Sequence, residues 1–174
     1  MHKVYLLLGS NEGNCLEQIT RAIELIELQL GHVIKKSSIY KSEPWGFETE
    51  NFFLNQVILV ETENSPSLIL DTLLEIEKLL GRKRNQNGYE SRTIDIDILF
   101  YDNIIIETNN LKIPHPLMAL RRFTLVPLNE IATDFLHPAT QLTIAETLNQ
   151  CEDKLKVIKY TANIKLNCKF LQNK

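Results

Sequence analysis

Two aspartates, Asp95 and Asp97, are the residues of this chain whose type and spacing point most directly to chemistry. They alternate with isoleucines in the segment SRTIDIDILFYD (91–102), and this period of two predicts a strand with both carboxylates on one face, roughly 6.6 Å apart at the backbone. Leu99 and Tyr101 continue that face, so it is at least half covered. Two ionised carboxylates in such surroundings repel each other unless a cation lies between them. Taken alone, the pair fits a cation site or, about as well, an exposed strand face or two unrelated ion pairs.

Basic residues in the preceding loop favour the cation site. They are Arg82, Lys83, Arg84 and Arg92. Carboxylate oxygens are preferred ligands of Mg²⁺ and guanidinium groups bind phosphate oxygens in pairs, so the combination is typical of a site for a magnesium–nucleotide complex. Each arginine taken singly is more often a solvated loop residue. The lack of apolar residues between Lys83 and Gly88 predicts a mobile lid.

A second candidate group surrounds Asn55, which lies in a mostly apolar strand. A buried amide needs hydrogen-bond partners, and bonds to the backbone are the commoner explanation. Nearby aromatic side chains usually indicate only core packing, but they could also enclose a flat heterocycle while Asn55 binds its edge. These aromatic residues are Trp45, Phe52, Phe53 and Phe123.

A third candidate is His115, which lies between Pro114 and Pro116 and is followed by Arg121 and Arg122. A lone histidine is more often a structural residue than a catalyst. The flanking prolines and the two arginines are also consistent with a rigid turn that binds phosphate.

The elements that must position these residues follow one another in the order β-α-β-β-α-β. We predict strands at 4–8, 32–40, 52–63 and 94–100, helices at 16–30 and 68–80, and a hairpin through Asp102 and Asn103 to 104–106. Ser65 and Pro66 are suited to the N-cap and first turn of the second helix. This order predicts an α/β (α+β) fold, a ferredoxin-like sandwich with an antiparallel sheet. Both helices would lie on one face, which leaves the other face open for ligands.

Beyond this unit, Thr143 and Glu146 form the pattern of a capping box for one more helix, and residues 156–161 are a candidate last strand. At 174 residues the chain has the length of about one domain. We therefore expect a single domain over 1–174, in which 151–174 is a C-terminal extension packed on it or trailing from it.

Composition excludes several classes of protein. The net charge of -3 and a sequence pI near 5.8 argue against general attraction to nucleic acid or to an anionic membrane. The three cysteines show no Cys/His spacing typical of a structural zinc site. The apolar run at the N-terminus is too short for a signal peptide, and no run approaches the length of a membrane span. We expect a cytoplasmic monomer that binds neither nucleic acid nor membrane.

Several motifs in this order resemble the 6-hydroxymethyl-7,8-dihydropterin pyrophosphokinase family of the folate pathway. They are GSN (9–11), EIEKLLGRKR (75–84), SRTIDIDILFYD (91–102), IPHPLMALRRF (113–123) and VPLNEIA (126–132). The resemblance implies the ferredoxin-like sandwich. It also implies transfer of the terminal diphosphate of ATP to the pterin hydroxymethyl group, with release of AMP.

The resemblance also implies roles for individual residues. Asp95 and Asp97 would bind two magnesium ions that bridge the ATP phosphates, while Arg82 and Arg92 would bind the phosphates and neutralise developing charge. The implied ATP-binding residues are Glu77, Arg84, Ile98, Lys112, His115 and Arg121. The implied pterin-binding residues are Ser42, Pro44, Trp45, Gly46, Phe53, Asn55 and Phe123.

Two rival functions remain to be compared. A ferredoxin-like RNA-binding module would need an aromatic, basic strand motif and a basic domain, whereas this chain is acidic. Another Mg-ATP-dependent enzyme, a nucleotidyltransferase, would pair Gly-Ser with D-x-D. In that class Gly-Ser lies shortly before the dyad, but here Gly9-Ser10 lies more than eighty residues before Asp95. The nucleotide released would separate the two enzyme classes.

Overall fold

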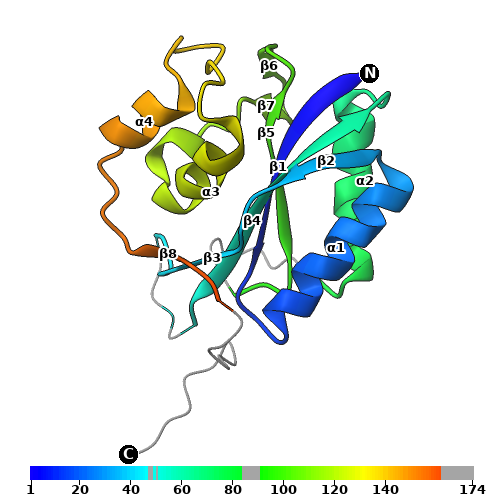
Figure 1. Ribbon diagram of the computed structural model, residues 1–174. Helices are drawn as coiled ribbons and strands as arrows, with labels where there is room; N and C mark the ends of the chain where they lie inside the picture. Colours follow the sequence, from blue (N-terminus) through cyan, green and yellow to red (C-terminus); the bar gives the residue numbers. More distant parts are fainter. Residues whose placement is uncertain (47–48, 50, 84–90, 162–174) are drawn as a thin grey trace, which may run out of the picture.

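The computed structural model of the chain describes residues 1–46, 49, 51–83 and 91–161 (Figure 1). Its elements in chain order are β1 (His2–Ser10), α1 (Cys15–Gln29), β2 (His32–Lys36), β3 (Tyr40–Ser42), β4 (Phe53–Thr62), α2 (Pro66–Leu79), β5 (Asp95–Tyr101), β6 (Ile106–Glu107), β7 (Lys112–Ile113), a 3-10 turn η1 (Met118–Leu120), α3 (Arg122–Ala132), α4 (Ile144–Gln150) and β8 (Val157–Lys159). The predicted lid lies mostly in 84–90, outside the described residues, as does Arg84.

An antiparallel sheet forms the centre of the protein. Its strands lie in the order β5-β1-β4-β3-β8, and β2 also pairs with β4. β1 contacts β4 along its whole length and β5 on its other side. β1 lies between β5 and β4, and its residues 4–10 are all buried. The protein is a mixed α/β structure with an antiparallel sheet, as the order of elements predicted.

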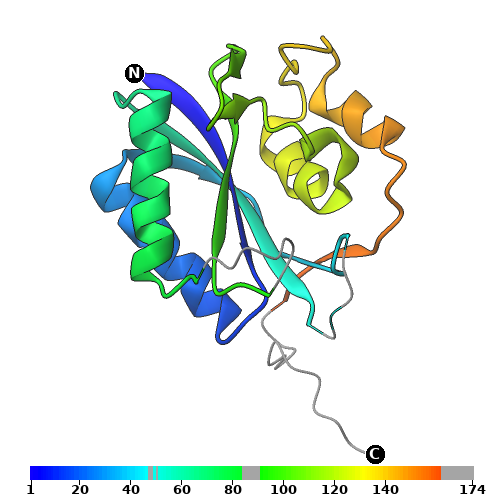
Figure 2. The same cartoon turned by 180° about the vertical axis from the view of Figure 1, so that it is seen from behind.

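Helices α1 and α2 pack side by side on one face of the sheet, also as predicted (Figure 2). Their apolar residues recur at helical spacing and meet the inward side chains of β1. Both helices begin at capping side chains, since Asn14 accepts a hydrogen bond from the Glu17 amide and Ser65 accepts one from the Leu68 amide. Pro66 occupies the first turn of α2, where its missing N–H costs nothing.

The opposite face is not fully open, so that part of the prediction was wrong. Helix α3 packs against it, and a second core forms there from Tyr5, Leu7, Leu99, Leu125 and Leu128. Figure 1 shows α3 and α4 on the side of the sheet away from α1 and α2. Pro127 lies inside α3 and hid the helical pattern of this segment. Ligands can therefore reach only the part of this face that α3 leaves uncovered.

Two further predictions needed correction. The strand expected at 32–40 is divided into β2 and β3, because Ser37 departs from the alternation and hydrogen-bonds Val57 through both its amide and its hydroxyl. The turn at Asp102 does form, but the strand beyond it pairs with β7 rather than with β5. The predicted capping box at Thr143 and the final strand, β8, are confirmed.

In the part of the chain that the structure describes, no helix has both the length and the apolar character needed to cross a membrane.

Candidate active site

Asp95 and Asp97 lie at the beginning of β5, where they pair with Gly9 and Leu7 of β1. Both carboxylates face the half of the sheet that carries α3, and both line the same cavity there. The period of two thus puts them on one face. The side chain of Asp95 is 19% exposed, so neither bulk solvent nor a packed core surrounds it.

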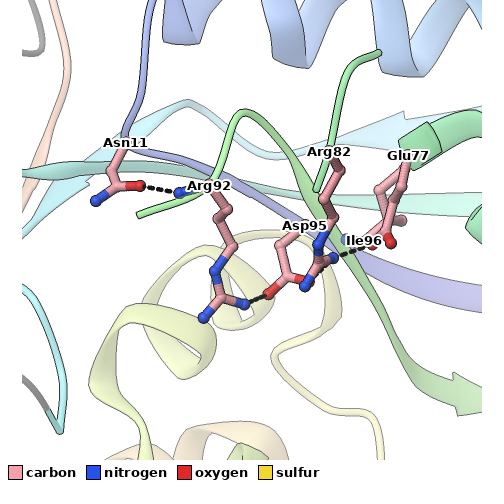
Figure 3. A network of polar contacts seen from close by, with 6 residues as sticks. All are labelled: Asn11, Glu77, Arg82, Arg92, Asp95 and Ile96. Carbon is pink, nitrogen blue, oxygen red and sulfur yellow. Dashed lines mark hydrogen bonds and ion pairs between the residues drawn. The ribbon is translucent and has the colours of Figure 1, made fainter. Parts of the chain in front are cut away.

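Two arginines neutralise Asp95 in the free protein (Figure 3). Arg82 and Arg92 each form an ion pair with a different oxygen of the Asp95 carboxylate. Arg82 also pairs with Glu77, which is buried in α2 and accepts a hydrogen bond from the amide of Ile96 at 2.8 Å. One carboxylate therefore holds two of the predicted phosphate-binding side chains next to the other predicted residues of the site.

The end of α2 positions Arg82. Gly81 has a φ of +84°, a conformation that favours glycine, and its amide donates to Lys78 O at 3.1 Å. The Arg82 amide donates to Glu77 O at 3.0 Å, which completes a helix-ending motif. The GRKR sequence therefore directs its first arginine back toward the sheet.

Electrostatics distinguish the second carboxylate from the first. Burial, together with the negative charge of Asp95, raises the pKa of Asp97 to about 7 against the opposing effect of Arg121 and Arg92. A nearby cation would therefore stabilise the ionised form of the Asp97 carboxylate. Mg²⁺ is commonly held by one or two carboxylates together with substrate phosphates, and this pair offers two carboxylates that line one cavity.

A cavity that we call the aromatic pocket opens on one side of the carboxylate pair. Of the predicted pterin-binding residues, its lining includes Ser42, Trp45, Phe53, Asn55 and Phe123. Pro44 and Gly46 flank Trp45 in the chain but do not line this cavity. Asn55 is 2% exposed and its Nδ2 donates to Ser42 Oγ at 2.8 Å. A methyl group at Gly9 would lie 3.2 Å from Asn55 Oδ1, so glycine leaves room for the amide.

Arg121 belongs to the aromatic pocket, although the resemblance assigned it to the nucleotide. Its guanidinium lies 4.8 Å from the Trp45 ring centre and 5.7 Å from the Phe123 ring centre. Both distances are in the range of cation–π contacts. The cation is 7% exposed and also lines the cavity that holds Asp97, so it carries positive charge to the boundary of the carboxylate pair.

A second cavity, the α2–β5 pocket, opens on the other side of the pair. It brings together four of the predicted nucleotide-binding residues: Glu77, Ile98, Lys112 and His115. Asn109 and Asn110 also line it. Asp95 and Asp97 line both this cavity and the aromatic pocket. The site can therefore hold two ligands that meet at the two carboxylates.

His115 lies in the α2–β5 pocket in a defined tautomer. Its Nδ1 accepts a hydrogen bond from the Leu117 amide at 3.2 Å, so in the neutral ring the proton is on Nε2. Burial, together with the positive charge of Arg121, lowers the pKa of His115 to about 4. His115 is thus a neutral N–H donor near pH 7.

The pKa of His115 leads to a testable pH dependence. The unfolded chain takes up this proton near pH 6.5 and the folded protein only near pH 4, so the folded protein loses stability as pH falls through that interval. We expect the His115 ring resonances to stay unchanged between pH 8 and pH 5 in an NMR titration. The spectrum of His115→Gln identifies the signal. A titration midpoint at pH 6 or above would contradict the buried neutral ring.

Sequence reasoning missed three polar residues of the site. Glu43 lines the aromatic pocket, and Ser10 and Asn11 contact the segment that carries Arg92. The GSN motif was the available signal for the last two, but its spacing of about eighty residues from Arg92 gave no indication of contact. Only the antiparallel pairing of β1 with β5 brings the two segments together.

Comparison with known proteins gives a consistent result. The family model described as 7,8-dihydro-6-hydroxymethylpterin-pyrophosphokinase (HPPK) matches residues 5–133. A relative from Haemophilus influenzae named 2-amino-4-hydroxy-6-hydroxymethyldihydropteridine pyrophosphokinase is 42% identical over 160 residues, which cover 91% of this chain and 98% of the relative. A relative of the same name from Aquifex aeolicus is 40% identical over 146 residues, covering 84% of this chain and 90% of its own.

Solved structures share the fold at lower sequence identity. The crystal structure of wild-type Plasmodium falciparum HPPK-DHPS matches 85% of this chain with a TM-score of 0.71 and 19% identity. This chain spans 44% of the length of that one, which is less than half. At this identity the likeness supports the fold alone.

Proposed function

This chain belongs to the 7,8-dihydro-6-hydroxymethylpterin-pyrophosphokinase family, and we propose that it transfers the terminal diphosphate of ATP to the hydroxymethyl group of 6-hydroxymethyl-7,8-dihydropterin, releasing AMP, in folate biosynthesis. One observation of the site carries the proposal: two cavities of different lining share Asp95 and Asp97. A transfer between two bound substrates requires such a common boundary.

The pterin would bind in the aromatic pocket. Phe53 and Phe123 would stack on its flat ring system, and Asn55 would hydrogen-bond its edge while Ser42 orients the amide. Trp45 would close the pocket beside Arg121. Pro44 and Gly46 would contribute through backbone groups of the same loop.

ATP would bind in the α2–β5 pocket. Ile98 would pack against the adenine, while Lys112 and the Nε2–H of His115 would contact the polar parts of the nucleotide. Glu77 would act from the wall of the pocket through Arg82, with which it pairs. Arg121 and Arg84 would support the phosphates, although Arg84 lies outside the described residues.

Asp95 and Asp97 would hold two Mg²⁺ ions, and ATP would be the co-substrate. The bound metal would supply charge neutralisation at the phosphate oxygens and a fixed orientation for them. The carboxylate pair fits this use because both side chains share one face and because Asp97 is destabilised as an isolated anion. Arg82 and Arg92, which pair with Asp95, lie directly beside these carboxylates.

The chain's own residues would then align the reaction. The pterin hydroxyl oxygen would attack the β-phosphorus and lose its proton to water. The bond from that phosphorus to the oxygen bridging to the α-phosphorus would break, and AMP would leave with that oxygen. Arg82 and Arg92, which lie beside Asp95, would bind the transferring phosphates and stabilise the charge that develops on them. No side chain needs to form a covalent bond to the substrate, so alignment and electrostatic stabilisation would supply the catalysis.

The aromatic pocket gives a prediction with a matched control. Asn55→Ala should weaken pterin binding by roughly 1–3 kcal/mol and leave ATP binding nearly unchanged, because the pterin edge then lacks a polar partner. Isothermal calorimetry with each ligand measures both effects. Gln56→Ala is the control, since the neighbouring buried amide bonds to Ser37 O at 2.6 Å and does not line the pocket. Equal losses for both ligands in Asn55→Ala would identify Asn55 as a structural residue instead.

The remaining features follow from the same assignment. We assign the fold to the ferredoxin-like type, because its elements follow the split β-α-β pattern. In chain order they are β1, α1, the divided strand β2/β3, β4, α2 and β5. We propose a single domain, with the C-terminal segment attached through the pairing of β8 with β3. A cytoplasmic monomer that acts on small molecules, without nucleic acid or membrane, is consistent with the net charge of -3.

Nucleotide analysis tests the proposed function. The protein is incubated with ATP, Mg²⁺ and 6-hydroxymethyl-7,8-dihydropterin, and the nucleotides are separated with and without the pterin. AMP that forms only with the pterin is the expected result. ADP would contradict the proposal, and release of free pyrophosphate would support a nucleotidyltransferase.

A further inference from the structure

Asn11 lies at the end of β1 with no exposed surface, and its side chain is directed at the segment that carries Arg92 (Figure 3). Asn11 Oδ1 accepts a hydrogen bond from the Arg92 amide at 2.7 Å. Asn11 Nδ2 donates to Ser91 Oγ at 3.1 Å. The oxygen and the nitrogen of one buried side-chain amide therefore bind two successive residues, which lie 80 and 81 positions further along the chain.

The backbone adds to this anchor. The Asn11 amide donates to Arg92 O at 3.2 Å, so residue 92 is held through both its N–H and its C=O. Ser10 Oγ donates to Thr93 O at 2.5 Å, one residue further along. The GSN loop thus fixes the backbone from Ser91 to Thr93, immediately before the strand that bears the carboxylates.

We propose that Asn11 is a positioning residue for Arg92: it fixes the backbone from which the Arg92 guanidinium reaches first Asp95 and then the transferring phosphate. This inference rests on the proposed function. Arg82 is fixed independently by the end of α2, so the two arginines approach Asp95 from separate supports. Asn11 lines neither the aromatic pocket nor the α2–β5 pocket.

The expected effect is specific to the chemical step. A displacement of about 1 Å at a catalytic group can cost on the order of 100-fold in rate. Because the backbone bond from Asn11 to Arg92 O survives the substitution, we expect Asn11→Ala to lower kcat by about 10-fold. The dissociation constants of ATP and of the pterin, each measured alone, should change by less than about 2-fold, since Arg92 acts after both have bound.

A double-mutant cycle separates positioning from a general structural role. Asn11→Ala is made in the wild-type chain and in Arg92→Ala, and kcat is measured for all four proteins. If Asn11 acts through Arg92, it has no effect once that guanidinium is gone, so the two losses are not additive. Asn14→Ala is the matched control, because it removes another asparagine amide from the same loop, one that caps α1 rather than contacting Arg92.

Amide hydrogen exchange provides a readout that does not depend on activity. The Arg92 amide should exchange at least about 10-fold faster in Asn11→Ala than in the wild-type protein, while its rate in Asn14→Ala stays unchanged. If Asn11→Ala does not fold, Asn11→Ser replaces it, since the shorter hydroxyl cannot reach both the Arg92 amide and Ser91 Oγ. The same loss of kcat and the same faster exchange are expected.

The outcomes are distinguishable. A wild-type protein that releases no AMP overturns the proposed function, whatever the variants do. A wild-type protein that does release AMP, together with an equal loss from Asn11→Ala in both backgrounds, overturns the positioning role of Asn11. Unchanged exchange at Arg92 overturns the anchoring on which that role depends.

Discussion

Replacing Asp95 or Asp97 by alanine is expected to lower turnover by on the order of 100-fold or more. Each substitution removes a carboxylate from the boundary that the aromatic pocket and the α2–β5 pocket share. Without it, the Mg²⁺ that would neutralise the transferring phosphates has one protein ligand fewer at the point where the two substrates meet. Steady-state kinetics at saturating Mg²⁺ and both substrates measure the loss.

The fold should survive these substitutions. In Asp95→Ala, Arg82 retains Glu77 as its partner, and in Asp97→Ala a carboxylate with an unfavourable pKa is removed. Asp71→Ala is the control, because this exposed carboxylate of α2 lines the α2–β5 pocket but not the aromatic pocket, so it is not part of their shared boundary. Its turnover should stay within about 3-fold of wild type. Turnover near that of the wild type in Asp95→Ala or Asp97→Ala would remove the pair from the mechanism.

Arg92→Ala is expected to lower turnover far more than it raises the dissociation constant for ATP alone. In the free protein Arg92 is paired with Asp95, so its guanidinium already has an anionic partner before ATP binds and gains little from ATP alone. An interaction made chiefly in the transition state lowers kcat when it is lost. We expect a fall in kcat of on the order of 100-fold and a change in the ATP dissociation constant of less than about 3-fold.

Single-turnover kinetics and calorimetry test this separation. Arg21→Ala, on the exposed surface of α1, controls for the loss of one positive charge. If the dissociation constant for ATP rose in Arg92→Ala by the same factor as kcat fell, Arg92 would bind the ground state and the transition state alike. Its assignment as a group that stabilises the transition state would then be wrong.

Local sequence patterns predicted the elements that carry the site. The alternation of Asp95 and Asp97 with isoleucines located β5, and the caps at Ser65 and Thr143 located two helix starts. These signals are local, so they can be read without knowing which segments pair. The predicted face shared by the two aspartates followed from the geometry of any strand.

The missed features depend on contacts between distant segments. The division of β2 from β3 arises from the hydrogen bonds of Ser37 with Val57. The alternation of residues in 32–40 contains no information about these bonds. Helix α3 covers part of the ligand face despite Pro127, because its apolar side chains complete a second core against the sheet. Asn11 meets Arg92 only because β1 pairs with β5. Pairing and burial of this kind are tertiary properties, and a single sequence does not specify them locally.

The structure shows which of the two pockets each described site residue lines, which residue type alone does not indicate. The α2–β5 pocket contains four of the residues that the family resemblance linked to ATP, whereas Arg121 lies against Trp45 and Phe123 in the aromatic pocket. Arg121 also opposes the rise in the pKa of Asp97 and contributes to the low pKa of His115. The charge of Arg121 therefore influences the pKa of groups in both pockets.

Following the β-phosphate of ATP tests the central claim most directly. The protein is given ATP labelled with ³²P at the β position, and in a parallel reaction at the γ position, together with Mg²⁺ and 6-hydroxymethyl-7,8-dihydropterin. Transfer of an intact diphosphate predicts that both labels appear in the pterin product and that the released AMP carries neither. Arrival of the γ label alone, with the β label retained in ADP, would contradict diphosphate transfer between the two pockets.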